Sequence, residues 1–144
     1  MKNIWITGAS SGIGRALALK FAKEGWQVAV SARRENLLNE LSELNKNIFS
    51  FPLDVNNKDK CKETFEQIKK KYQNIDICFF CTGTWDPKKE KDIDIEQIEH
   101  VMKVNFFGTL NCIKVVEQYF KDKKRGHISI VSSVAGYRGL PNST

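Results

Sequence analysis

The first place where residue types and spacing suggest chemistry is a short run of glycines and serines near the start of the chain. Residues 7–14 read TGASSGIG and join an apolar β-branched run to a helical pattern. Glycine allows a tight turn and a close approach to a ligand, and free N–H groups at a helix N-terminus favour an anion. We therefore predict a loop that holds the pyrophosphate of a dinucleotide, the alternative being a turn that simply requires glycine. The residues expected to bind it are Gly8, Ser10, Ser11, Gly12, Ile13 and Gly14.

Two arginines close the second apolar run, which ends SARR at residues 31–34. In dinucleotide sites an acid near this point binds the ribose 2′-hydroxyl of NAD, whereas an arginine accommodates the 2′-phosphate of NADP. Here Ala32 stands where the acid is expected, and Arg33 and Arg34 follow. A guanidinium binds phosphate through paired hydrogen bonds, so the pattern predicts NADP as the cofactor. The alternative is that both arginines are ordinary surface charges at a strand end.

A pair of serines ends the last apolar run, HISIVSS, at residues 127–133. The carboxyl ends of parallel strands are where ligands bind in an open α/β sheet. A hydroxyl there could therefore contact a bound ligand. The alternative is a serine that satisfies the backbone of the following turn.

These candidate groups depend on an alternation of strands and helices. The runs interpreted as buried strands are residues 2–7, 26–32, 47–53, 75–82 and 127–132. Helical patterns cover residues 12–24, 34–44, 58–72 and 95–105, and the last either continues through 107–120 or breaks near Asn105 and Gly108. In the first helix, Ile13, Leu17 and Phe21 form the expected buried stripe. The alternation predicts an α/β fold with a doubly wound parallel sheet, in one domain spanning residues 1–144.

Composition argues against several classes of function. The net charge is +6, and no window is long and apolar enough for a membrane span. No signal peptide is recognisable, so we expect a cytoplasmic location and no membrane partner. Lysines alternate with acids and no nucleic-acid motif accompanies them, so nucleic acid is not an expected partner. Cys78 and Cys81 form a C-x-x-C in a predicted strand, on opposite faces, which argues against a redox or metal site.

Six short motifs occur in order along the chain: TGASSGIG, VAVSARR, LDV, CTG, VNFFG and SIVSSVAG. Together they resemble the short-chain dehydrogenase/reductase family. The resemblance implies a Rossmann-like sheet in the strand order 3-2-1-4-5 that lacks the last strands of the family fold. It also implies hydride transfer between NADP(H) and a small-molecule carbonyl or alcohol substrate.

The resemblance also implies further cofactor contacts. Asp54 would contact the adenine amino group, with the backbone of Val55 beside it. Thr82 and Gly83 would border the nicotinamide ribose. The preceding Phe80 and Cys81 stand where the family usually has two asparagines, so the match is weaker at this point.

The resemblance places catalytic roles on two residues. Ser133, rather than Ser132, matches the serine that hydrogen-bonds the substrate carbonyl. Asn105 matches the asparagine that kinks a helix and holds a water molecule of the proton relay. Taken alone, Asn105 could equally be a helix cap or a hydrogen-bonded buried side chain.

The family's acid is a tyrosine with a lysine four residues later, and its expected position lies beyond Thr144. Tyr137 is no substitute, because Pro141 stands where that lysine is needed. We therefore predict that the 144-residue chain is a truncated and inactive reductase, the alternative being a non-catalytic nucleotide-binding or interaction module. We also predict an exposed edge at the fifth strand and an apolar helix before it, both favouring a homo-oligomer.

Overall fold

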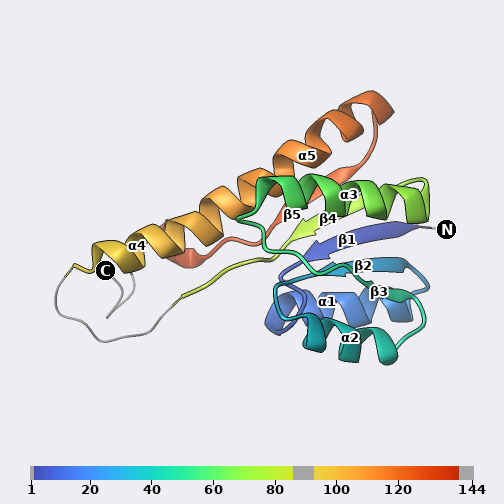
Figure 1. Ribbon diagram of the computed structural model, residues 1–144, viewed down its shortest axis with the longest axis horizontal. Helices are drawn as coiled ribbons and strands as arrows, with labels where there is room; N and C mark the ends of the chain where they lie inside the picture. Colours follow the sequence, from blue (N-terminus) through green and yellow to red (C-terminus); the bar gives the residue numbers. More distant parts are fainter. Residues whose placement is uncertain (1, 86–92, 140–144) are drawn as a thin grey trace.

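The computed structural model describes residues 2–85 and 93–139, in which helices cover both faces of a parallel sheet (Figure 1). The strands are β1 (Asn3–Thr7), β2 (Gln27–Ser31), β3 (Ile48–Ser50), β4 (Ile77–Phe80) and β5 (His127–Ile130). The helices are α1 (Gly12–Lys23), α2 (Glu35–Glu43), α3 (Lys58–Tyr72), α4 (Ile95–Met102) and α5 (Gly108–Lys123), with a π-helical segment η1 (Lys103–Phe107) and a 3-10 turn η2 (Val134–Gly136). The sheet order is β3-β2-β1-β4-β5, as predicted.

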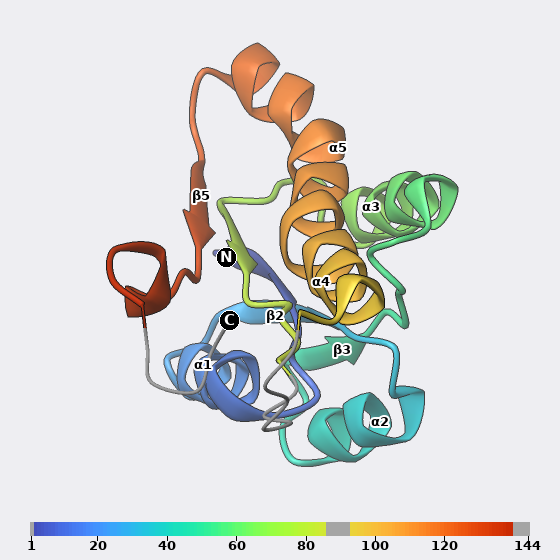
Figure 2. The same cartoon turned by 90° about the vertical axis from the view of Figure 1, so that its left-hand side faces the viewer.

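Alternate side chains of the central strand enter two separate hydrophobic cores, as the pleat of a strand requires. Ile4 and Ile6 of β1 belong to the core shared with α1 and α2, whereas Trp5 belongs to the core shared with α3 and α5. Trp5 is fully buried, and its ring centroid lies 5.7 Å from those of Phe65 and Phe80. Figures 1 and 2 show the two helix pairs on opposite faces, so the doubly wound arrangement is confirmed.

The first helix packs through a different stripe from the one predicted. Its buried residues are Gly14, Ala18 and Ala22. Ile13, expected in the core, is 59% exposed, and Leu17 and Phe21 are only partly buried. A Cβ on Gly14 would lie 2.5 Å from the carbonyl oxygen of Gly8. The start of the helix therefore approaches the loop after β1 too closely for a side chain at Gly14, and the buried residues of the helix are all small.

The helix whose continuity the sequence left open runs unbroken through residues 95–123, with η1 as a π-helical insertion between α4 and α5. Gly108 begins α5, and a Cβ there would lie 2.5 Å from Cγ2 of Val55, so glycine permits a close approach to the segment after β3. α3 supplies the neighbouring helix for part of the apolar surface. Phe106, Phe107 and Leu110 nevertheless remain 42–55% exposed.

β5 forms one edge of the described sheet and pairs there with β4 alone, as expected for an exposed edge strand. Ile130 is 52% exposed, so this strand is less buried than an apolar β-branched run suggests. The basic residues Lys121, Lys123, Lys124 and Arg125 surround the C-terminus of α5, where cations suit the helix dipole. In the described ranges, we find no helix that is both long and apolar enough to cross a bilayer.

The buried hydroxyl of Thr7 gives a first prediction. Thr7 is 1% exposed, and its Oγ1 has no hydrogen-bond partner among the described residues. Because a buried unsatisfied polar group costs about 1–3 kcal/mol, we expect Thr7→Val to raise the free energy of unfolding by about 1 kcal/mol. Urea denaturation followed by circular dichroism measures the change.

Ser31→Ala is the matched control for Thr7→Val. The Ser31 hydroxyl accepts a buried hydrogen bond of 3.0 Å from the Trp5 indole N–H. Removing the hydroxyl leaves that N–H unpaired, so we expect Ser31→Ala to lower the free energy of unfolding by about 1–3 kcal/mol. A loss of stability in Thr7→Val as large as that in Ser31→Ala would contradict the assignment of Thr7 as unsatisfied.

Candidate nucleotide-binding site

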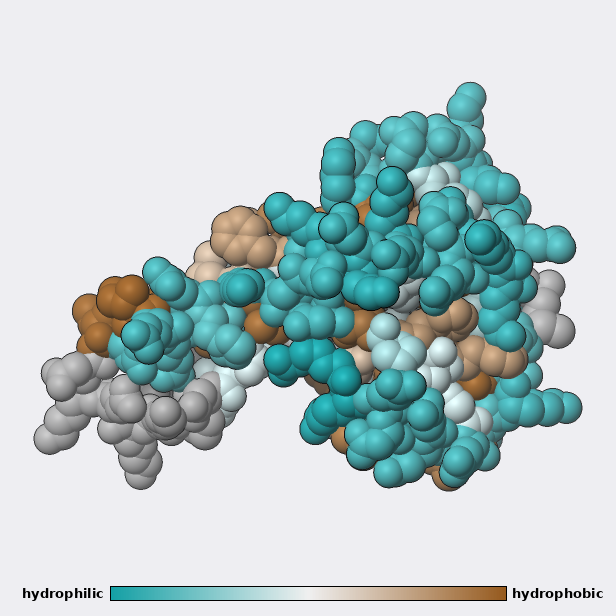
Figure 3. All heavy atoms as spheres, viewed as in Figure 1, coloured by the Kyte–Doolittle hydropathy of each residue, from teal (hydrophilic) through white to brown (hydrophobic). Residues whose placement is uncertain are grey.

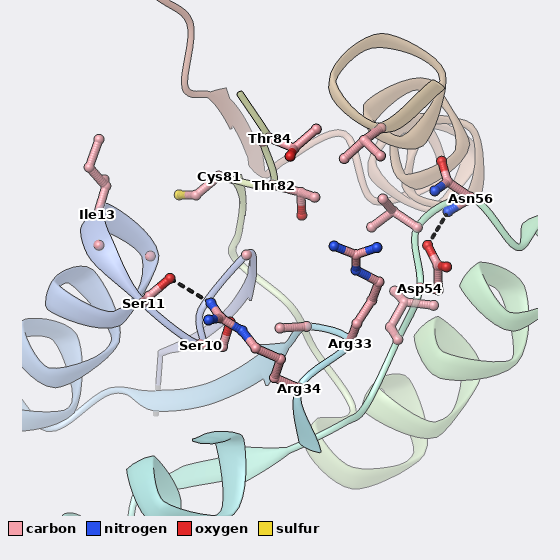
Figure 4. A pocket seen from close by; sticks show the side chains of 18 residues that line it. Ser10, Ser11, Ile13, Arg33, Arg34, Asp54, Asn56, Cys81, Thr82 and Thr84 are labelled. Carbon is pink, nitrogen blue, oxygen red and sulfur yellow. Dashed lines mark hydrogen bonds between the residues drawn. The ribbon is translucent and has the colours of Figure 1, made fainter. Parts of the chain in front are cut away.

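A groove of about 530 Å³ lies at the carboxyl edge of the sheet, where β1, β2 and β4 end (Figure 4). All twelve predicted cofactor-binding residues line it: Gly8, Ser10, Ser11, Gly12, Ile13, Gly14, Arg33, Arg34, Asp54, Val55, Thr82 and Gly83. The remaining lining residues, which were not assigned to the site from sequence, are Ala32, Leu53, Asn56, Cys81, Thr84 and Val104. All but Val104 are chain neighbours of the predicted cofactor-binding residues, and Val104 precedes Asn105. Adjacency was therefore the signal that could have identified them.

The glycine loop is shaped by backbone contacts that exclude side chains. Gly8 has a φ of +68°, and a Cβ there would lie 2.6 Å from the carbonyl oxygen of Cys81. Gly12 also has a positive φ, +55°, but open space lies where its Cβ would be. Ser11 is the N-cap residue of α1, yet its side chain does not cap the helix, and the first turn carries no acid. The N–H groups of that turn are thus available to an anion in the groove.

The two arginines after β2 have different surroundings. The guanidinium of Arg34 donates to the hydroxyl oxygen of Ser10 from Nε at 3.2 Å and from Nη2 at 2.8 Å, and Nη2 also donates to Ser11 at 2.7 Å. Arg33 has no hydrogen bond or ion pair with any described residue, and its guanidinium points into the groove (Figure 4). Since Asp54 is the one acid among the lining residues, the charged side chains of the groove favour an anion.

Asp54 and Val55 form the wall opposite the glycine loop. The Asp54 carboxylate accepts a hydrogen bond of 3.0 Å from the Asn56 backbone N–H and so closes a turn. The Val55 carbonyl accepts 2.9 Å from the Asn111 side-chain amide and 3.5 Å from the Cys61 thiol. Through Val55, α3 and α5 therefore fix this wall from behind. The predicted contact of Asp54 with adenine remains a prediction.

Asn105 lies within η1 and pairs with the segment that follows β4. Its side-chain oxygen accepts from the Thr84 backbone N–H at 2.7 Å, and its amide donates to the Thr84 carbonyl at 2.9 Å. Its own backbone carbonyl accepts 2.9 Å from the Thr109 hydroxyl. Asn105 thus anchors the Thr82–Gly83 end of the groove to the helix without lining the groove itself. Its predicted catalytic role is a separate matter and remains a prediction.

Ser133 does not belong to the residues that line the groove. Its hydroxyl oxygen accepts 3.1 Å from the Ala135 backbone N–H and caps η2, so it satisfies the turn. The sequence contains one Tyr-x-x-x-Lys pair, Tyr119 and Lys123 on α5. The Tyr119 hydroxyl accepts 2.9 Å from the Ile75 backbone N–H, at the amino end of β4 and away from the groove.

The C-x-x-C cysteines lie on opposite faces of the sheet, as predicted. Cys78 is buried in the core shared with α3 and α5, and Cys81 packs against the other core. All four cysteines have free thiols. Burial raises the pKa of Cys78, and raises the pKa of Cys81 to about 11. The described ranges contain no group of three or more His, Cys, Asp or Glu residues that could hold a metal ion.

The raised pKa of Cys81 predicts slow and pH-dependent alkylation. Only the thiolate attacks iodoacetamide, so we expect the rate to rise about tenfold per pH unit between pH 7 and pH 10. The alkylated fraction of each cysteine is measured by peptide mass spectrometry, and the buried Cys61, Cys78 and Cys112 should react only in urea. Rapid labelling of Cys81 at pH 7 would contradict this prediction.

Comparisons with known proteins agree with the fold. The family model described as short chain dehydrogenase matches residues 2–144. The chain is 34% identical to a Dictyostelium discoideum dehydrogenase/reductase SDR family protein 7-like, covering 96% of this chain and 47% of that one. It is 35% identical to a Thermotoga maritima 3-oxoacyl-acyl-carrier-protein reductase, covering 96% of this chain and 58% of that one. The chain thus spans about half the length of these curated relatives.

Two solved structures have the same fold. One is ElxO with NADP bound, at a TM-score of 0.91 and 26% identity, covering 99% of this chain and 59% of that one. The other is a short chain dehydrogenase from Bacillus anthracis, at a TM-score of 0.91 and 27% identity, covering 98% of this chain and 61% of that one.

Proposed function

The chain belongs to the short chain dehydrogenase family, and we propose that its groove binds NADP(H) for hydride transfer to or from a small carbonyl or alcohol. The observation that carries the proposal is that two anion-binding features share one groove. The first turn of α1 carries no side-chain cap, and Arg33 points into the same space without a partner among the described residues.

The groups present fit a dinucleotide. The glycine loop offers backbone N–H groups and the hydroxyls of Ser10 and Ser11 to a pyrophosphate. Arg33 offers a guanidinium to a 2′-phosphate, and Ala32 places no carboxylate beside it. The name of one solved relative, ElxO with NADP bound, supports the same choice of cofactor.

The nicotinamide supplies the hydride, and the protein supplies orientation and polar contacts. Thr82 and Gly83 would border the nicotinamide ribose, because they line the end of the groove that Asn105 holds through Thr84. Ser133 is the proposed catalytic hydroxyl. Its oxygen accepts from Ala135, so its proton remains available to a substrate carbonyl.

We further propose that these 144 residues, taken alone, bind the nucleotide without turnover. The specific support is that Tyr119 and Lys123 hold the one Tyr-x-x-x-Lys spacing in the sequence and lie away from the groove. The cytoplasmic location and the absence of a nucleic-acid partner remain predictions.

Isothermal titration calorimetry of the 144-residue chain with NADPH and NADH tests the binding proposal. We expect NADPH to bind more tightly than NADH. The binding proposal would be rejected if neither nucleotide bound. A spectrophotometric assay at 340 nm with aliphatic and aromatic ketones and aldehydes tests turnover. Oxidation of NADPH that depends on both protein and carbonyl compound would reject the non-catalytic proposal.

We also propose that the chain forms a homo-oligomer through the long helix and the β5 edge. Apolar side chains gather on the projecting end of this helix (Figure 3), where Ile95, Ile98 and Met102 are 42–61% exposed. Exposed apolar surface and an unpaired strand edge both favour association. We expect a dimer or larger species in sedimentation velocity at micromolar concentration, and Met102→Glu should shift it toward monomer. A monomeric wild-type chain would reject the proposal.

A further inference from the structure

The contacts of Arg34 distinguish it from Arg33, although both line the groove and neighbour each other in sequence. The Arg34 guanidinium gives three hydrogen bonds to two hydroxyl oxygens of the glycine loop. We propose that Arg34 is a positioning residue, which orients Ser10 and Ser11 toward the phosphates common to NADPH and NADH. This inference rests on the proposed nucleotide binding. Selection between the two nucleotides then depends on Arg33.

A guanidinium has only donors, so each serine oxygen must act as the acceptor in these hydrogen bonds. The Ser10 oxygen accepts two of them, from adjacent nitrogens of the same guanidinium. The Ser11 oxygen accepts one. Each hydroxyl keeps its proton, and no described residue accepts a hydrogen bond from either serine. Arg34 therefore uses the acceptor side of both hydroxyls and leaves their protons available to a phosphate oxygen, which can only accept.

The same contacts hold the loop in place. Ser10 is only 9% exposed, so its hydroxyl has little freedom beyond the guanidinium and the groove. Ser11 does not cap α1, which leaves its hydroxyl to Arg34 and the groove as well. The bridge links the end of β2 to the beginning of α1, two segments that meet where a pyrophosphate would lie. Ordering these side chains before binding reduces the entropy that binding must overcome.

Arg33 contrasts with this arrangement. It makes no hydrogen bond or ion pair with the described residues, and Figure 4 shows its guanidinium in the groove between Thr82 and Asp54. Its donors are therefore available to a group of the ligand that only one nucleotide carries. Because Arg34 already donates to the loop, its loss should weaken the binding of both nucleotides alike. The loss of Arg33 should weaken the binding of NADPH alone.

The test measures NADPH and NADH dissociation constants by calorimetry for the wild type, Arg34→Gln, Arg33→Gln, the double variant Ser10→Ala/Ser11→Ala and the triple variant that adds Arg34→Gln. We expect Arg34→Gln to weaken both nucleotides about tenfold, the effect of losing hydrogen bonds to a charged group. When Arg34→Gln is added to the Ser10→Ala/Ser11→Ala variant, the affinity for each nucleotide should fall by less than about twofold, because a positioning residue acts through its partners. Arg15→Gln is the control, since Arg15 is exposed on α1 and outside the groove.

Two results would overturn the inference while leaving nucleotide binding intact. One is a loss in Arg34→Gln confined to NADPH, which would make Arg34 a direct reader of the 2′-phosphate. The other is an equal Arg34→Gln effect with and without the serine hydroxyls. If the wild type binds neither nucleotide, the proposed function fails together with this inference. Thermal melting of each variant verifies that the fold is retained.

Discussion

Replacing Arg33 with glutamine is expected to weaken NADPH binding by about fiftyfold and to leave the NADH dissociation constant within about twofold, because hydrogen bonds to a charged group contribute about 1.5–3 kcal/mol. Arg33 points into the groove and has no other partner among the described residues. Glutamine keeps a similar length but loses the charge and the planar fork. Calorimetry at fixed ionic strength measures both constants, since salt screens an exposed charge.

The adjoining position offers a complementary test of selectivity. Ala32 lines the groove immediately before Arg33, where a carboxylate could accept from a ribose 2′-hydroxyl and would repel a 2′-phosphate. Ala32→Asp should therefore tighten NADH binding and weaken NADPH binding. A loss in Arg33→Gln that is equal for the two nucleotides would show that Arg33 does not select the phosphate.

Gly8→Ala is expected to lower the free energy of unfolding by about 3 kcal/mol, which is a large part of the 5–15 kcal/mol typical of a domain. A left-handed backbone costs a residue with a Cβ about 1–2 kcal/mol, and overpacking costs about 1–3 kcal/mol more. Both apply here, because Gly8 has a φ of +68° and its Cβ would lie 2.6 Å from the Cys81 carbonyl oxygen. Urea denaturation gives the change in stability, and calorimetry with NADPH gives the accompanying loss of affinity.

Two glycines serve as controls for Gly8→Ala. Gly12 shares a positive φ, +55°, but has nothing within 4 Å of its Cβ position, so Gly12→Ala isolates the backbone cost of about 1–2 kcal/mol. Gly139 has neither a positive φ nor a neighbour within 4 Å, so Gly139→Ala should be nearly neutral. Equal stabilities for Gly8→Ala and Gly139→Ala would refute the contact between the loop and the end of β4.

Much of the groove could be predicted because its residues lie in short contiguous motifs. TGASSGIG and SARR each follow an apolar run, and parallel strands bring their carboxyl ends to one edge of the sheet. That topology is sufficient to gather the loop, Arg33 and Asp54 without knowledge of any side-chain contact. Val104 was not assigned to the groove, although it begins the VNFFG motif, because that motif indicated a role for Asn105 only and the groove contact of Val104 depends on how the helix packs.

Other features could not be predicted because they depend on distances between segments far apart in sequence. The buried residues of α1 were predicted to be large, whereas the observed ones are small. A hydrophobic pattern does not contain the information that Gly14 lies close to the Gly8 backbone. The bridge from Arg34 to Ser10 and Ser11 spans 23 or 24 positions of the chain. Motif spacing places these residues at one edge but does not show which arginine is already hydrogen-bonded.

The sequence by itself determined the parallel α/β sheet and the glycine and arginine positions of the groove, because strand periodicity, glycine spacing and right-handed crossovers are local rules. The strand order and the roles of Asp54, Thr82 and Gly83 were implied by the family resemblance. The tertiary structure alone decided which hydrogen-bond partners those residues have. It engages Arg34 with the loop serines while Arg33 remains unpaired among the described residues, and it turns Ser133 to the Ala135 N–H. The physical reason is that a hydrogen bond depends on distances of about 3 Å and on direction, which only the packed chain defines.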